Sequence, residues 1–282
     1  MGFKLLPNPS SWRRLSIATW KVPDNSSVYS YFSEDATPVL HFLSKINQSS
    51  PVKITITHLI AKATALVLKK YPDINGIIRW RRIYLRESVV LFLQVAIPAE
   101  NSDQKPDLSG AVIRECEKKT IIQIAEELNA KCQAIRKKQD PQFKKSIGLF
   151  NKTPPLFLSW MLRLATFLSY NLGLSFPKLG IIKDPFGLAM ITNLGSFGVP
   201  APLGPLVPPS RVPLLLCLGV IADKPWVVYP EPGREVDGKV EARPVFEMGV
   251  TFDHRFMDGS TASKMYKMMR EILREPEKWL SV

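Results

Sequence analysis

The chain has few cysteines and no pattern that indicates a disulfide framework. Its 282 residues contain three, placed far apart at Cys116, Cys132 and Cys217, with no Cys-x-x-Cys pair. Three scattered thiols are too few for the disulfide scaffold of a small secreted protein. They indicate buried, reduced thiols and a cytoplasmic protein, and we expect no metal site.

From the sequence we also expect no leader segment, no internal repeat and no nucleic-acid-binding motif. The first nine residues hold one lysine and a brief apolar run, and Arg13 and Arg14 follow, so we predict no signal peptide. The formal charge is +13, but its basic residues are spread over several short clusters. We therefore expect no nucleic acid as a partner. An evenly solvated basic surface, a phosphate-bearing substrate and an anionic membrane surface all remain consistent with this charge.

What the sequence does have is enough apolar content for one large domain. Hydrophobic residues make up 45% of the chain, which is ample for a core at this length. Apolar residues at helical spacing predict helices over Thr55–Tyr71 and Thr120–Lys138. β-prone runs predict strands at Ser88–Pro98 and Val212–Ile221, and the nearly continuous apolar run of the first predicts that it is buried on both faces. We predict an α/β fold and one domain over residues 1–282, with an insertion at about residues 140–183.

The insertion contains an apolar stretch at Pro155–Pro177, near the roughly 20 residues that span a membrane. Arg163, Asn171 and several serines argue against a span, which would also separate two parts of one domain. We expect an apolar helix or helical hairpin packed on the domain or on a neighbouring subunit. The other option is that this segment lies in a membrane surface.

The stretch Val250–Gly259 holds the main candidate for chemistry. A β-prone segment ends there and a helical pattern begins, with Ser260 or Thr261 as the expected helix cap. His254 and Asp258 lie at this junction, where a sheet can aim catalytic side chains. An imidazole has an unperturbed pKa of about 6.5, so near neutral pH it can accept a proton from a thiol or hydroxyl. A surface histidine beside a loop carboxylate is the alternative.

Three motifs, in the same order along the chain, resemble those of one known family. Asp253 to Gly259 reads Asp-His-Arg-x-x-Asp-Gly, which resembles the signature of the dihydrolipoamide acyltransferases. Leu188–Gly198 contains Ile-Thr-Asn-Leu-Gly-Ser-Phe-Gly, which resembles their second signature, and Trp12–Ala18 resembles their opening segment. The chain thus resembles the catalytic domain of the 2-oxoacid dehydrogenase acyltransferases, in the chloramphenicol acetyltransferase-like superfamily. Leu108–Ile113 departs from the family pattern.

This resemblance implies a fold, an assembly and roles for particular residues. The fold is a two-layer sandwich with helices packed on a large mixed sheet, and the assembly is a homotrimer with active sites between subunits. His254 is then the general base, and Thr192 from a neighbouring subunit donates a hydrogen bond to the oxyanion of the intermediate. Asp258, paired with Arg14, holds the histidine loop, and Asn193 and Gly259 support the site. For Arg14, an ordinary surface position is an equal alternative.

The resemblance also implies substrates, and here several alternatives remain. We expect coenzyme A or an acyl-CoA as substrate and direct transfer to a thiol, hydroxyl or amine. Because Met1 lies close to the start of the resemblance, we predict a stand-alone enzyme without a lipoyl group on this chain. A lipoyl substrate would come from another protein. A non-catalytic scaffold subunit, associated with a membrane through residues 155–177, is the alternative function.

Overall fold

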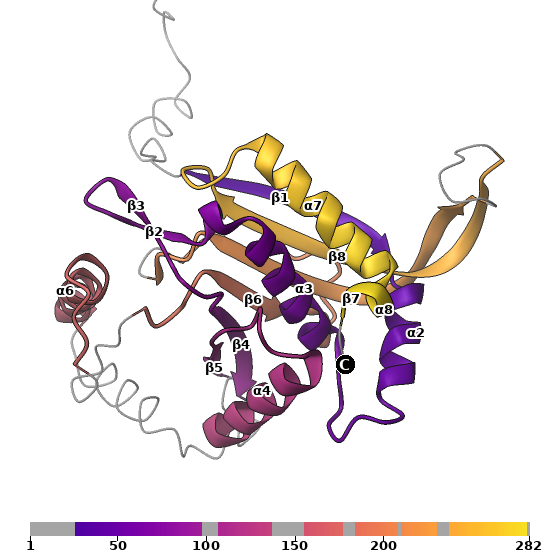
Figure 1. The fold of residues 1–282 in the computed structure, drawn as a ribbon, viewed down its shortest axis with the longest axis horizontal. Coiled ribbons are helices and arrows are strands. Elements are labelled where there is room, and N and C mark those ends of the chain that lie inside the picture. The colour runs from indigo at the N-terminus through magenta and orange to yellow at the C-terminus, as the bar shows by residue number, and fades with distance from the viewer. Residues whose placement is uncertain are drawn as a thin grey trace, which may run out of the picture.

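A six-stranded mixed sheet with helices on one face forms the body of the protein (Figure 1). The computed structural model describes residues 26–97, 107–136, 155–176, 184–207, 210–229 and 237–280. The strand order is β1-β8-β7-β6-β4-β5. In chain order these strands are β1 (Ser27–Asp35), β4 (Leu91–Ile97), β5 (Asp107–Ile113), β6 (Ala189–Asn193), β7 (Leu214–Val228) and β8 (Lys239–Asp253). The predicted α/β architecture is confirmed.

The helices pack on the sheet through the apolar faces that the sequence pattern predicts. They are α2 (Thr37–Ile46), α3 (Ile56–Lys70), α4 (Ile121–Arg136), α7 (Gly259–Arg274) and α8 (Pro276–Trp279). In α4 the buried positions Ile121, Ile124, Ala125, Leu128 and Ile135 recur at helical spacing. A continuous apolar core therefore joins these helices to the sheet.

A histidine side chain helps to cap the start of α3, a feature that the sequence pattern did not specify. The N-cap is Thr55, whose backbone N–H donates to Nδ1 of His58 over 3.1 Å, so His58 closes the first turn. Burial lowers the pKa of His58 to about 4, which keeps the ring neutral and able to accept this bond. His58 is therefore a structural residue.

Strand β4 corrects one expectation. We predicted a strand buried on both faces, but burial alternates: Leu91, Leu93 and Val95 are buried, whereas Phe92 and Gln94 are half-buried. The reason is that the helices of the core cover one face of the sheet, whereas the other face of β4 is covered only in part, by contacts such as that between Phe92 and Phe186.

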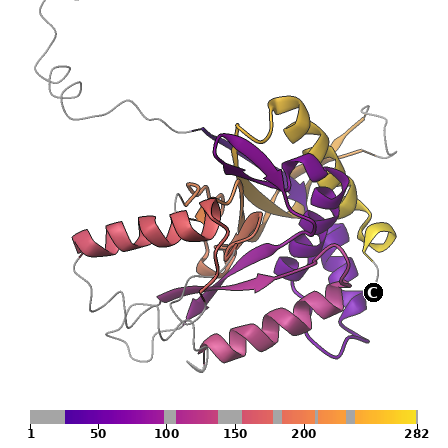
Figure 2. The same ribbon diagram turned by 60° about the vertical axis from the view of Figure 1, so that its left-hand side comes forward.

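The described part of the insertion, residues 155–176, is helical over most of its length. Helix α6 (Pro155–Thr166) continues into a π-helical turn over Phe167–Asn171, and α6 stands away from the sheet (Figure 2). The π-helical turn holds it: the hydroxyl of buried Tyr170 donates to the carbonyl of Ser210 over 2.7 Å. Among the described residues, no helix has both the length and the apolar character that crossing a membrane requires. The cytoplasmic location stays a prediction.

Two short strands pair beside this turn. Strands β2 (Gly76–Arg79) and β3 (Arg82–Leu85) form an antiparallel hairpin separate from the main sheet. At its tip, the Trp80 ring meets Phe167 edge-on, with centroids 6.0 Å apart. The hairpin therefore shares an apolar contact with the insertion.

Candidate functional site

His254 lies immediately after β8, on the loop that leads into α7. Its side chain is exposed, and its backbone N–H donates to the carbonyl of Ser26 over 2.8 Å. Ser26 directly precedes β1, which pairs with β8 in an antiparallel register that sets Ser27 opposite Asp253. The sheet edge therefore fixes the backbone at His254 while leaving its ring open to a substrate.

The buried side chain of Asp253 also holds this loop, a role that the sequence analysis missed. Its buried carboxylate accepts from the Ser26 hydroxyl over 2.8 Å and from the Arg255 backbone over 2.9 Å. The Arg255 guanidinium also donates to both carboxylate oxygens. Burial raises the pKa of Asp253, but the bonds from Arg255 and Ser26 outweigh it and hold the pKa below its usual range. The carboxylate therefore stays ionised and ties both neighbours of His254 to the sheet.

Asp258 fixes the far end of the loop by capping α7. Its Oδ1 accepts from the backbone N–H of Thr261 over 2.8 Å, and this bond lowers the pKa of the carboxyl. The cap is therefore Asp258 and not Ser260 or Thr261, because Asp258 is the last residue with extended backbone before the helix. Gly259 is the first helical residue. Arg14, the expected partner of Asp258, lies outside the described residues, so that pair stays a prediction.

Thr192 and Asn193 end strand β6 at the middle of the sheet. Thr192 is buried and lies opposite Cys217 of β7. The Asn193 amide donates to the Thr57 hydroxyl over 2.9 Å, and its oxygen accepts from the Gly195 backbone over 3.0 Å. Asn193 therefore links the end of β6 to the first turn of α3 and to the turn that follows.

The sheet does not bring Thr192 and His254 together within one copy of the chain. Thr192 shares a row with Cys217 and Gly249, whereas Phe252, two residues before His254, is three residues further along β8. Two strand spacings of about 4.8 Å and three rises of about 3.3 Å separate the backbones of Thr192 and Phe252 by about 14 Å. His254 lies beyond that row.

The described cysteines offer no ready nucleophile near these residues. Burial raises the pKa of Cys217, the neighbour of Thr192, to about 11, and burial raises that of Cys116 to about 12. Both therefore remain protonated thiols near neutral pH, and thiols are weak nucleophiles. Among the residues with described side chains, His254 is the best-placed proton acceptor at the end of the sheet.

Comparison with protein families identifies the class to which this arrangement belongs. The model of the family described as 2-oxoacid dehydrogenases acyltransferase (catalytic domain) matches residues 14–142 and 187–281. The chain belongs to this family and is of the acyltransferase class. The unmatched segment between the two ranges coincides with the insertion predicted at about residues 140–183. The resemblance drawn from the three motifs is confirmed.

Similar proteins agree with this assignment. The dihydrolipoyllysine-residue acetyltransferase component of the acetoin cleaving system of Bacillus subtilis is 28% identical over 79% of this chain and 42% of that protein. A succinyltransferase component of a 2-oxoglutarate dehydrogenase complex, from Staphylococcus saprophyticus, is 22% identical over 91% of this chain and 49% of that protein. The chain thus spans between two fifths and half of the length of these relatives.

A solved structure supports the fold. A probable dihydrolipoamide acetyltransferase from Listeria monocytogenes superposes with a TM-score of 0.60 at 17% identity, covering 99% of this chain and 97% of that one. The expected family architecture, helices on a large mixed sheet, is therefore confirmed.

The comparisons overturn one expectation about cofactors. We predicted that no lipoyl group belongs to this chain, but the relatives are named for acyl transfer at a dihydrolipoyllysine residue. Because the chain matches only part of those proteins, the position of Met1 gives no ground for excluding a lipoyl group. The prediction was wrong because it relied on where the sequence begins.

Proposed function

We propose that this domain transfers an acyl group between the thiol of a dihydrolipoyl group and coenzyme A. One observation carries the proposal: an exposed imidazole, His254, follows a sheet strand in a loop anchored on both sides by Asp253 and Asp258. Preorganised geometry of this kind is what a general base requires. The family match and the named activity of the relatives supply the class of reaction.

In the proposed mechanism, His254 takes the proton of the attacking thiol. The sulfur then attacks the carbonyl carbon of the acyl thioester and forms a tetrahedral intermediate with a negatively charged oxygen. When this intermediate collapses, the carbon–sulfur bond of the original thioester breaks. The departing thiolate takes the proton back from the imidazolium, so no covalent acyl-enzyme forms and all protons balance.

Thr192 is proposed as the donor that stabilises the oxyanion, and it acts from a neighbouring copy. The separation of Thr192 from the histidine loop within one chain supports this arrangement. In other enzymes, removing one such donor lowers kcat by roughly 10²–10³. A homotrimer with shared sites is the assembly proposed here. A non-catalytic scaffold is the alternative, and it predicts no transfer at all.

The test replaces His254 with a side chain of similar size that cannot act as a base. Acyl transfer from acetyl-CoA, and from its longer and succinyl homologues, to dihydrolipoamide is measured for wild type, His254→Gln and His41→Gln. We expect His254→Gln to lose about 10²–10⁴ in rate, the usual contribution of a general base.

His41→Gln is the matched control because His41 is an exposed histidine on α2, remote in sequence from the loop. It should retain the wild-type rate. Equal rates in all three proteins would refute the assignment of His254. Absence of transfer by the wild type with every thioester would favour the scaffold.

A further inference from the structure

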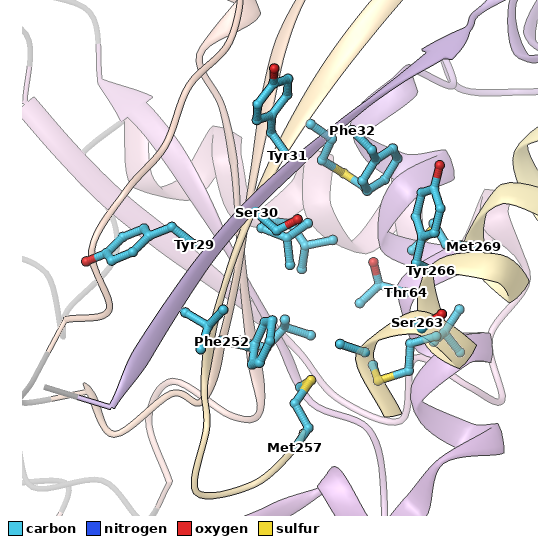
Figure 3. Close-up of a pocket in the computed structure, with 18 of the residues that line it drawn as sticks. Tyr29, Ser30, Tyr31, Phe32, Thr64, Phe252, Met257, Ser263, Tyr266 and Met269 are labelled. Carbon is cyan, nitrogen blue, oxygen red and sulfur yellow. The ribbon is translucent and has the colours of Figure 1, made fainter. Parts of the chain in front are cut away.

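A large apolar cavity lies between the sheet and the helices, beside the histidine loop. Its volume is about 600 Å³, and its walls come from β1, β7, β8, α3 and α7 (Figure 3). Small-molecule sites typically measure about 300–1,000 Å³ and are mostly apolar. The size of this cavity is therefore that of a ligand site.

The side chains around the cavity suit a flexible hydrocarbon. Four methionines line it, and unbranched thioether side chains adapt their shape to an apolar guest. They are Met248, Met257, Met265 and Met269. On β1, Tyr29 and Tyr31 point away from the cavity, whereas Phe32 points toward it (Figure 3). Strand alternation therefore places Val28, Ser30 and Phe32 on the cavity side of β1, and Ser30 is the polar residue among the three.

The cavity adjoins the candidate active site through the loop itself. Phe252 and Met257 lie on either side of His254 in the sequence, and both line the cavity, as does Gly259. A guest in the cavity would thus contact the segment that carries the imidazole. Because the cavity adjoins the histidine loop, its expected occupant is part of the substrate rather than an unrelated ligand.

One polar group inside the cavity has no partner. Thr64 of α3 is 1% exposed and lines the cavity, and its hydroxyl oxygen has no hydrogen-bond partner among the described residues. Figure 3 shows Thr64 among the lining side chains of β1 and α7. An unpaired buried hydroxyl is costly, by about 1–3 kcal/mol. A ligand oxygen would satisfy it.

We propose that this cavity binds the chain of an acyl group longer than acetyl, with the Thr64 hydroxyl donating to an oxygen substituent on that chain, because the thioester carbonyl itself lies at His254 in the proposed mechanism. The inference deepens the proposed function, on which it rests for the identity of the substrate. It assigns the selection of the acyl chain to the space between β1 and α7.

Octanamide is a suitable probe, because it needs no turnover and carries an eight-carbon chain and a neutral carbonyl, which stands in for the oxygen substituent. Calorimetric titration of the full chain should show saturable binding of one octanamide per chain and no measurable binding of acetamide. Ala262→Leu, which adds apolar volume to the lining of the cavity, should weaken octanamide binding by about tenfold, equivalent to about 1.4 kcal/mol. Glu271→Leu is the matched control, since Glu271 is exposed on the same helix.

Thr64→Val provides a second variant of nearly the same shape. It should weaken octanamide binding by about fivefold or more, because the bound carbonyl loses its donor. Wild-type protein that does not bind octanamide would overturn the proposal, as would wild-type affinity in a folded Ala262→Leu protein. His254→Gln should bind octanamide like the wild type. The acyl-transfer assay therefore tests the proposed function, and octanamide binding tests the cavity assignment, so each can fail without the other.

Discussion

Two carboxylates hold the backbone around His254, and they do so in different ways. Asp253 is buried and bonds to both Ser26 and Arg255, whereas Asp258 is exposed and caps the first turn of α7. Each fixes one end of a short segment, so the imidazole between them has a defined position. For the proposed role of His254, such anchoring would supply the fixed geometry that a general base needs.

The Asp253 cluster predicts a pH-dependent contribution to stability. Its bonds lower the pKa in the folded state, so the stabilisation is complete above the unfolded carboxyl pKa of about 3.9 and is lost as the pH falls through the lower folded value. At pH 7, Asp253→Asn should reduce the free energy of unfolding by about 1.5–3 kcal/mol, the range for hydrogen bonds to charged groups. Urea unfolding between pH 7 and pH 3 measures this difference.

The matched control is Glu241→Gln, which breaks an exposed ion pair with Arg243 on the same strand. That change should cost less than about 1 kcal/mol. For Asp253→Asn, the gap from wild type should narrow as the pH falls below the unfolded carboxyl pKa of about 3.9. A gap that stays constant with pH would show that the Asp253 charge does not stabilise the loop.

The sequence located the loop but not the groups that hold it. The Asp-His-Arg-x-x-Asp-Gly pattern identifies the segment because its residues are adjacent in the chain. Ser26, in contrast, bonds to Asp253 from 227 positions away. That contact exists only once β1 pairs with β8, and no local pattern reports such a pairing. The capping role of Asp258 could have been predicted from the sequence, since aspartate is among the preferred N-cap residues.

At the level of elements, helices were easier to predict than strand partners. Predicted and observed bounds agree to within two residues for α3 and for the start of α4, because apolar positions recur at helical spacing and one face is buried. The β2–β3 hairpin was missed for a physical reason. Its two turn residues, Trp80 and Arg81, both have positive φ (50° and 60°), without the Asn or Gly that usually marks such a turn.

The docking of the insertion on the domain can be tested at Tyr170. Tyr170→Phe removes the hydroxyl that donates to the Ser210 carbonyl but keeps the ring that lies beside Arg211. Leaving that carbonyl unpaired in a buried setting should destabilise the protein by about 1–3 kcal/mol. The release of this contact should also speed trypsin cleavage after exposed Arg163 on α6.

Tyr229→Phe is the matched control, because Tyr229 is exposed, and it should change neither quantity. If Tyr170→Phe leaves both unfolding and cleavage at wild-type values, the Tyr170 contact does not anchor the insertion. The remaining candidate would then be the ring contact between Trp80 and Phe167.

For the molecule as a whole, the central proposal is that two copies of the chain complete one site. The order of β8, β7 and β6 puts His254 and Thr192 in different rows of the sheet, two strands apart. A shared site therefore requires an assembly, which couples catalysis to oligomerisation. The sequence could suggest a shared site only through the family resemblance, because local sequence patterns do not reveal which strands are neighbours in the sheet.

The most direct test of this central claim is a complementation measurement. His254→Gln and Thr192→Val chains are produced separately and by co-expression, and acyl transfer is measured after purification. Each variant alone should be strongly impaired. In a randomly mixed homotrimer, about a quarter of the shared sites would pair an intact histidine with an intact threonine, so about a quarter of wild-type activity should return. If co-expression restores no more than the variants show alone, His254 and Thr192 do not act together across copies, and the account is contradicted.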